Sequence, residues 1–121
     1  MSEIPAVQYL TVPDLVERFS STPSKIRGLL RDQYIAGIRI DGVLSIPAEF
    51  VRENETLEGL RGSLIQLADA GLTNDQAIAW LLSDNDELGC RPIDSLIAGH
   101  KAQVRRAAQS LAFIDRELWA Q

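Results

Sequence analysis

The hydrophobic pattern of residues 9–32 predicts two short helices joined by a tight turn. The apolar positions of the first helix share one helical face and are Leu15, Val16 and Phe19. A polar run at residues 20–22 then interrupts the pattern. The apolar positions of the second helix, at residues 23–32, are Ile26, Leu29 and Leu30. Each helix therefore has one face to bury and one to expose.

Both helices have a local start signal. Thr11 and Asp14 have the spacing of a capping box, in which each side chain accepts a hydrogen bond from the other residue's backbone N–H. Residues 9–10 are expected to pack just ahead of this cap. Thr22 followed by Pro23 predicts a second N-cap, with proline at the first helical position.

A β-hairpin is predicted at residues 38–46, directly after the second helix. Its strand formers are Ile38, Ile40, Val43, Leu44 and Ile46. Asp41 and Gly42 favour a type I′ turn, because both central residues of that turn need positive φ. Arg39 alternates with the isoleucines, so it points away from the core. The order helix, turn, helix, hairpin predicts a helix-turn-helix with the hairpin as its wing.

The pattern after the hairpin is mostly helical. Residues 47–51 predict one helical turn, and the polar, acidic residues 52–62 predict a linker or surface loop. The later helices are expected from an N-cap at Ser63 to Gly71, from a Thr73–Gln76 capping box to Leu82, from Pro92 to Ile97, and from Lys101 to Leu118.

These elements predict a fold that is mainly α with a small β-hairpin. A winged helix-turn-helix module is expected at residues 9–52 and a helical C-terminal extension at residues 63–121. A chain of 121 residues is long enough to bury a stable core without disulfides or bound metals. The sequence leaves open whether the two parts pack as one domain.

The outward face of the second helix is small, polar and basic, with no carboxylate before Asp32. Such a face suits a DNA major groove, which is lined by phosphates and base-edge acceptors. The candidate DNA-contacting residues are Arg18, Ser21, Thr22, Ser24, Lys25, Arg27, Gly28 and Arg31, with Arg39 on the wing. The alternative is a solvated helix surface, on which basic residues at this spacing are common.

The same segments resemble a known family. The run YLTVPDLVERF, then SKIRGLLRD and GIRIDGVLSIP, resembles the winged helix-turn-helix of excisionase-like and MerR-like DNA-binding domains. With EGLRGSLIQLADAGLTNDQAIAWLL and PIDSLIAGHKAQVRRAAQSLAF, the chain is similar to a small actinobacterial family of winged-helix DNA-binding proteins. This resemblance covers residues 9–113. It implies binding of double-stranded DNA by the N-terminal module and no catalysis. The role that we expect for such binding is transcription regulation.

The C-terminal extension has a second resemblance. Small and apolar residues at positions 77–81, 88–99 and 104–107 are similar to the C-terminal domain of Xre/ParS-type antitoxins. That resemblance implies oligomers and a protein partner. The alternative function is therefore a protein-interaction module whose C-terminal helices bind a partner, and a homodimer is also left open.

The net charge of −5 opposes DNA binding as a whole-chain property. From Thr11 to Arg52, however, six basic residues stand against five acidic ones, a net charge near +1. From Glu53 onward, six basic residues stand against eleven acidic ones, near −5. We therefore expect modest, strongly salt-sensitive DNA binding unless the protein dimerises.

A second basic cluster lies at the start of the last helix. Lys101, Arg105 and Arg106 are close together in sequence there. They have two interpretations, a second phosphate-binding patch or an ordinary solvated helix face.

The remaining features argue against an enzyme. The chain has one cysteine, Cys90, and one histidine, His100, which gives no disulfide framework and no basis for a zinc site. It has no glycine-rich nucleotide motif. We therefore expect no catalytic residue, no cofactor and no metal. No apolar run reaches 18 residues and no secretory signal begins the chain, so the expected location is the cytoplasm, on the nucleoid, away from membranes.

Overall fold

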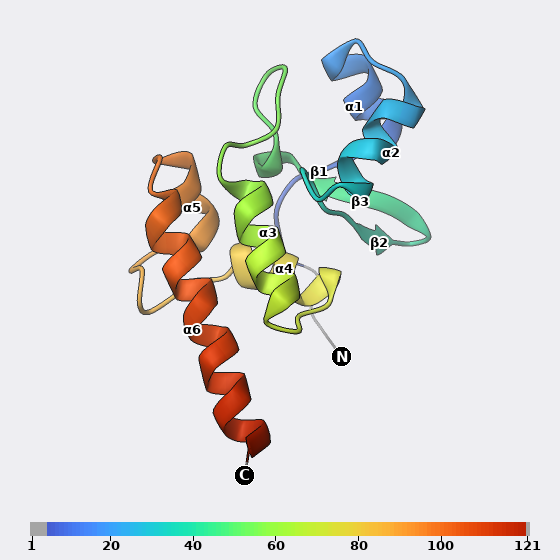
Figure 1. Cartoon of the computed structure of the whole chain (residues 1–121). Helices are drawn as coiled ribbons and strands as arrows, with labels where there is room; N and C mark the ends of the chain where they lie inside the picture. Colours follow the sequence, from blue (N-terminus) through green and yellow to red (C-terminus); the bar gives the residue numbers. More distant parts are fainter. Residues whose placement is uncertain (1–4, 121) are drawn as a thin grey trace.

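Figure 1 shows the protein as a computed structural model that describes the backbone of residues 5–120 and the side chains of residues 5–111. The predicted boundary at residue 121 lies outside this range. The elements are β1 (Tyr9–Thr11), α1 (Val12–Phe19), α2 (Pro23–Arg31), β2 (Ile38–Ile40), β3 (Val43–Pro47), the 3-10 turn η1 (Ala48–Phe50), α3 (Leu60–Asp69), α4 (Asn74–Leu81), α5 (Pro92–Ile97) and α6 (Lys101–Ala120). The fold is mainly helical with a small antiparallel sheet, as the sequence predicted.

The sheet has three strands in the order β1-β3-β2, one more than the predicted hairpin. β2 and β3 pair as predicted, with Ile40 opposite Val43. The other edge of β3 pairs with β1, where Tyr9 lies opposite Pro47. Residues 9–10 are therefore part of a strand rather than only a lead-in to the first cap. Three residues are too few to show an alternating pattern, and their pairing partner is distant in sequence.

The predicted local signals of the N-terminal half are present. The Thr11 N–H donates to the Asp14 carboxylate at 2.9 Å, and the Asp14 N–H donates to the Thr11 hydroxyl at 3.3 Å. The Thr22 hydroxyl accepts from the backbone N–H of Lys25 at 3.2 Å. The hairpin turn has φ of 52° and 82° at its two central residues, as a type I′ turn requires. The capping box that opens α4 is also formed.

The start of α3 differs from the prediction. α3 begins at Leu60 with Gly59 as its N-cap, so the predicted N-cap at Ser63 is wrong. Ser63 is buried inside the helix, where its hydroxyl donates to the Gly59 carbonyl at 3.0 Å. Gly59 has φ of +86°, and a β-carbon there would lie 2.7 Å from the Cβ of Lys101 in α6. Glycine is therefore required where α3 and α6 approach, and the end of the predicted loop at residues 52–62 belongs to the core.

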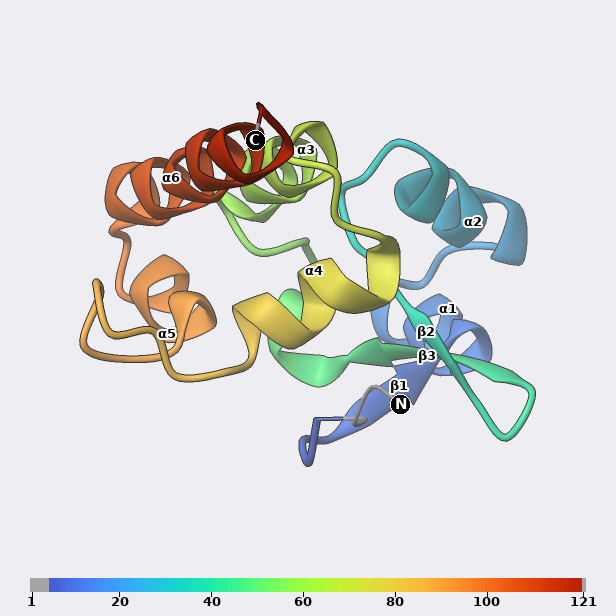
Figure 2. The same ribbon diagram turned by 90° about the horizontal axis from the view of Figure 1, so that it is seen from below.

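One continuous cluster of buried apolar side chains runs through both halves of the chain. Its fully buried members include Leu15, Ile26, Ile46, Phe50, Leu60, Leu67, Ile78, Ile93 and Val104. α3 packs along α6, and α4 contacts both α3 and β2 (Figures 1 and 2). Within residues 5–120, no helix has both the length and the apolar character needed to cross a membrane.

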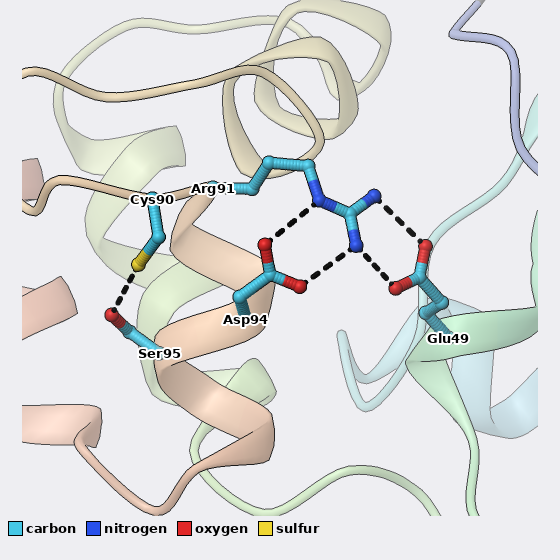
Figure 3. Close-up of polar contacts among 5 residues, drawn as sticks. All are labelled: Glu49, Cys90, Arg91, Asp94 and Ser95. Atoms are coloured by element: carbon cyan, nitrogen blue, oxygen red, sulfur yellow. Dashed lines mark hydrogen bonds and ion pairs between the residues drawn. The ribbon is translucent and has the colours of Figure 1, made fainter.

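An ion-pair cluster of Glu49, Arg91 and Asp94 also joins the two halves (Figure 3). Glu49 lies in η1, and Arg91 is the N-cap of α5. The Arg91 guanidinium donates to both Glu49 oxygens at 2.7 and 3.1 Å, and to both Asp94 oxygens at 2.8 and 3.0 Å. Bidentate pairs of this kind are geometrically specific, so the cluster sets how α5 sits against the end of the sheet.

The same hydrogen bonds change the protonation of the cluster. Those from Arg91 lower the pKa of Asp94 below its ordinary value of 3.8, although burial acts in the opposite direction. The hydrogen bonds to Asp94 and then Glu49 raise the pKa of Arg91. The folded state therefore favours the charged forms of Arg91 and Asp94.

Replacing Arg91 with alanine is expected to lower the free energy of unfolding by about 1–2 kcal/mol, because two carboxylates lose a partly shielded cationic partner. Urea unfolding at neutral pH measures this loss. Arg106→Ala is the matched control, since no ion pair among residues 5–111 involves Arg106. Equal losses in the two variants would contradict a role for the cluster.

The stabilisation by the ion-pair cluster depends on pH. Because the folded pKa of Asp94 is lowered, its stabilising contribution is present above its unfolded pKa and is lost as the pH falls through the folded value. The wild-type chain should therefore lose more stability than Arg91→Ala between about pH 5 and about pH 2.

Candidate nucleic-acid interface

A groove of about 550 Å³ lies between α1, α2 and the β2–β3 hairpin. Its lining residues are Val12, Pro13, Val16 and Glu17 from α1, Pro23 and Arg27 from α2, and Arg39 and Leu44 from the hairpin. The floor is largely apolar, and two arginines from different elements border it. The second predicted helix and the hairpin both border this groove.

Arg27 and Arg39 are the two predicted residues that the fold brings together on this groove. Both side chains are exposed. Arg39 donates from Nη1 to the Gly42 carbonyl oxygen at 3.2 Å, so its guanidinium lies along the hairpin turn. The pair can therefore present two cations across one apolar channel, an arrangement that suits a phosphate-bearing strand.

The other predicted residues of α2 lie around its outward surface. Ser24, Lys25 and Arg31 are exposed, whereas Gly28 is half-buried. Arg31 forms an exposed ion pair with Asp32, with Nε 3.4 Å from Oδ1. A β-carbon at Gly28 would lie 3.5 Å from Nη2 of Arg31, which is ordinary contact. The outward face is thus accessible, small and basic, as the apolar stripe of the helix implied.

Three predicted residues lie at the edges of this surface. The Thr22 hydroxyl is already an N-cap acceptor. Ser21 is half-buried in the turn between the helices. Arg18 is exposed in the last turn of α1 but does not line the groove. Of the predicted residues, Arg27 and Arg39 are therefore the ones that line the groove.

The groove also includes residues that the sequence did not single out. Val16 belongs to the apolar stripe of α1 but is only half-buried, and its free side lines the groove with Leu44. Glu17 adds a carboxylate to the same lining. An apolar stripe in the sequence does not show which of its side chains stay partly exposed. Those side chains are identified only by the packing of the hairpin against α1 and α2.

The end of α2 is held by the C-terminal half. Arg61 of α3 donates from Nε to the carbonyl oxygen of Asp32, the C-cap of α2, at 2.9 Å. Its guanidinium carbon lies 5.0 Å from the centre of the Tyr34 ring. An unpaired carbonyl at a helix C-terminus is thereby satisfied by a cation, which also suits the helix dipole.

The structure separates the three basic residues at the start of α6. Arg105 lies against Gly62 of α3, whereas Arg106 lines a hollow beside Glu87 and Leu88. Lys101 forms an ion pair with Glu58 at 3.1 Å. Among the described side chains, no group of three or more His, Cys, Asp or Glu residues is arranged to hold a metal ion.

Comparison with known proteins adds to this geometry. Residues 57–112 match the family model described as the Rv2175c C-terminal domain of unknown function. The C-terminal half is thus similar to that domain. This match does not support the predicted resemblance of the same segment to antitoxins.

The likeness to Rv2175c extends beyond that domain. The chain is 26% identical over 115 residues to the DNA-binding protein Rv2175c of Mycobacterium tuberculosis, covering 84% of this chain and 79% of that protein. The NMR structure of Rv2175c matches with a TM-score of 0.81 at 25% identity, covering 93% of this chain and 86% of that chain. The fold is therefore shared over nearly the whole length, and the relative is actinobacterial, as the sequence resemblance suggested.

Thr22 offers a test of how α2 is held. Thr22→Ala is expected to lower the free energy of unfolding by about 1 kcal/mol, because the Lys25 N–H loses its acceptor. Thr22→Ser keeps a hydroxyl acceptor and serves as the control. Chemical denaturation of both variants measures the difference, and an alanine variant as stable as the serine variant would rule out the cap.

Proposed function

We propose that the chain is a non-enzymatic protein that binds double-stranded DNA and regulates transcription. In this proposal α1 and α2 form a helix-turn-helix, residues 23–32 enter the major groove, and the hairpin at residues 38–46 is the wing. Its site of action would be the nucleoid in the cytoplasm. The single observation that carries the proposal is the shared groove of Arg27 and Arg39, one from each of these elements.

The surrounding surface supports DNA as the partner. Ser24 and Lys25 are exposed beside Arg27 at the start of α2, and Arg31 follows one turn later. Arginine can pair with guanine O6 and N7 or with phosphate in a bidentate manner. The name of the relative, DNA-binding protein Rv2175c, supports the same class of partner. The protein-partner alternative has no comparable observation in its favour.

Electrostatics limit the expected affinity. The whole chain has a net charge of −5, and Glu17 lines the groove itself. Few phosphates can be neutralised by one copy, so non-specific affinity should be modest and should fall steeply with salt. Sequence-dependent contacts from α2 would then account for most of the discrimination between DNA sites.

The proposal is tested by fluorescence anisotropy with mixed genomic DNA fragments across roughly 50 to 200 mM salt. We expect binding that weakens steeply with salt and enriches particular fragments. The double variant Arg27→Glu/Arg31→Glu should weaken binding roughly 100-fold or more, because two base or phosphate contacts become repulsive.

The matched control for that variant is Arg52→Glu/Arg106→Glu, which changes the net charge equally at exposed positions outside the groove. A loss confined to the α2 variant would assign the effect to position rather than to total charge. Unchanged affinity in the α2 variant would refute the assignment of α2, and an absence of wild-type binding at low salt would refute the function.

Glu17 provides a second, opposite test. Glu17→Gln should raise DNA affinity about 2- to 5-fold at low salt, because it removes a negative charge from a groove proposed to receive phosphates. Glu53→Gln removes an exposed acid elsewhere and is the control. The same anisotropy titrations measure both variants. An equal gain in both would point to net charge alone and against a backbone strand in the groove.

A further inference from the structure

The surface that adjoins the end of α2 lies within residues 57–112, the segment that matches the Rv2175c C-terminal domain model. α2, α3 and α6 follow one another along one side of the molecule (Figures 1 and 2). Arg61 of α3 is bound to the last carbonyl of α2 through its hydrogen bond to Asp32. Its guanidinium therefore lies at the edge of the helix that we propose for the major groove.

Arg105 of α6 continues this surface. Its Nη2 atom lies 2.8 Å from the point that a β-carbon on Gly62 would occupy, so the guanidinium rests on the backbone of α3. Gly62 is the neighbour of Arg61 in the same helical turn. The absence of a side chain at Gly62 thus lets Arg105 of α6 rest on the same turn of α3 that carries Arg61.

Two ion pairs form near these arginines without including them. Arg31 pairs with Asp32, and Lys101 pairs with Glu58. None of the ion pairs formed within residues 5–111 involves Arg61 or Arg105. Both side chains are exposed. An otherwise acidic C-terminal half therefore presents two exposed arginines at the first turn of α3, and one of them contacts the end of α2.

We propose that Arg61 and Arg105 form a second phosphate-binding surface, which contacts the DNA backbone that flanks the site read by α2. This inference rests on the proposed function. A duplex with a helix in its major groove has a phosphate strand along each side of that helix. Arg61 at the C-terminal end of α2, followed by Arg105 across the first turn of α3, is placed to meet such a strand. The unassigned role of the C-terminal domain would then include extending the DNA contact.

The arginine pair at the start of α6 provides the test. Arg105 lies on this surface, whereas Arg106, the next residue, lines the hollow beside Glu87 on another side of the helix. Arg105→Ala and Arg106→Ala therefore remove the same side chain at adjacent exposed positions. Thermal unfolding of both variants checks that neither change disturbs the fold.

The probe is a mixed-sequence DNA duplex of about two helical turns, with a second duplex of about one turn for comparison. On the long duplex, Arg105→Ala should weaken binding about 3- to 10-fold and reduce the slope of log affinity against log salt by about 1. On the short duplex the effect should shrink, because the flanking phosphates are missing. Arg105→Lys should recover most of the affinity, since a cation is restored.

Arg106→Ala is expected to leave both affinity and salt slope at the wild-type values. The inference is overturned if Arg105→Ala matches Arg106→Ala, or if its effect is the same on both duplexes. If Arg27→Glu/Arg31→Glu abolishes binding while Arg105→Ala does not weaken it, only the second surface fails. If the wild-type chain binds neither duplex at low salt, the proposed function fails with it.

Discussion

Burial of one apolar cluster across both halves of the chain is the constraint on which the rest of the structure depends. The N-terminal half contributes short helices and three short strands, which cannot enclose side chains such as Phe50 by themselves. Leu60, Ile78 and Ile93 from the later helices complete that enclosure. The position of α2 relative to the hairpin is therefore tied to the packing of the C-terminal helices.

Polar contacts refine the same arrangement at its edges. Arg91 links η1 to α5 through Glu49, and Arg61 links α3 to the end of α2. The side-chain amide of Asn74 in α4 donates to the Gly37 carbonyl just before β2, at 2.9 Å. Each of these contacts joins a residue of the proposed DNA-binding part to a C-terminal helix. Residues 57–112 thus help to hold the elements that border the groove.

The charge distribution follows the same division. Exposed basic residues occur on α2 and on the hairpin, where Arg27 and Arg39 border one groove, while most of the acids lie after residue 52. Arg61 and Arg105 are exposed basic residues within the acidic half, at the first turn of α3. Because screening confines exposed charges to roughly 8–10 Å, this local placement matters more for a DNA partner than the negative total.

Signals carried by neighbouring residues were enough to predict much of this molecule. The caps at Thr11, Thr22 and Thr73 and the Asp41-Gly42 turn depend on contacts within three or four residues, and all are present. The predicted limits of α5 were also confirmed. The start of α3 was predicted wrongly, because Gly59 is selected by the approach of α6 and not by its neighbours.

The sequence by itself therefore determined the helices, the hairpin and the basic outward face of α2, since each follows from local hydrogen bonding or from the period of apolar residues. Only the tertiary structure decided the pairing of β1, the shared groove of Arg27 and Arg39, and the separation of Arg105 from Arg106. These features depend on which elements pack together. Burial of the whole apolar cluster determines which elements pack together, and single residues in the sequence do not indicate it.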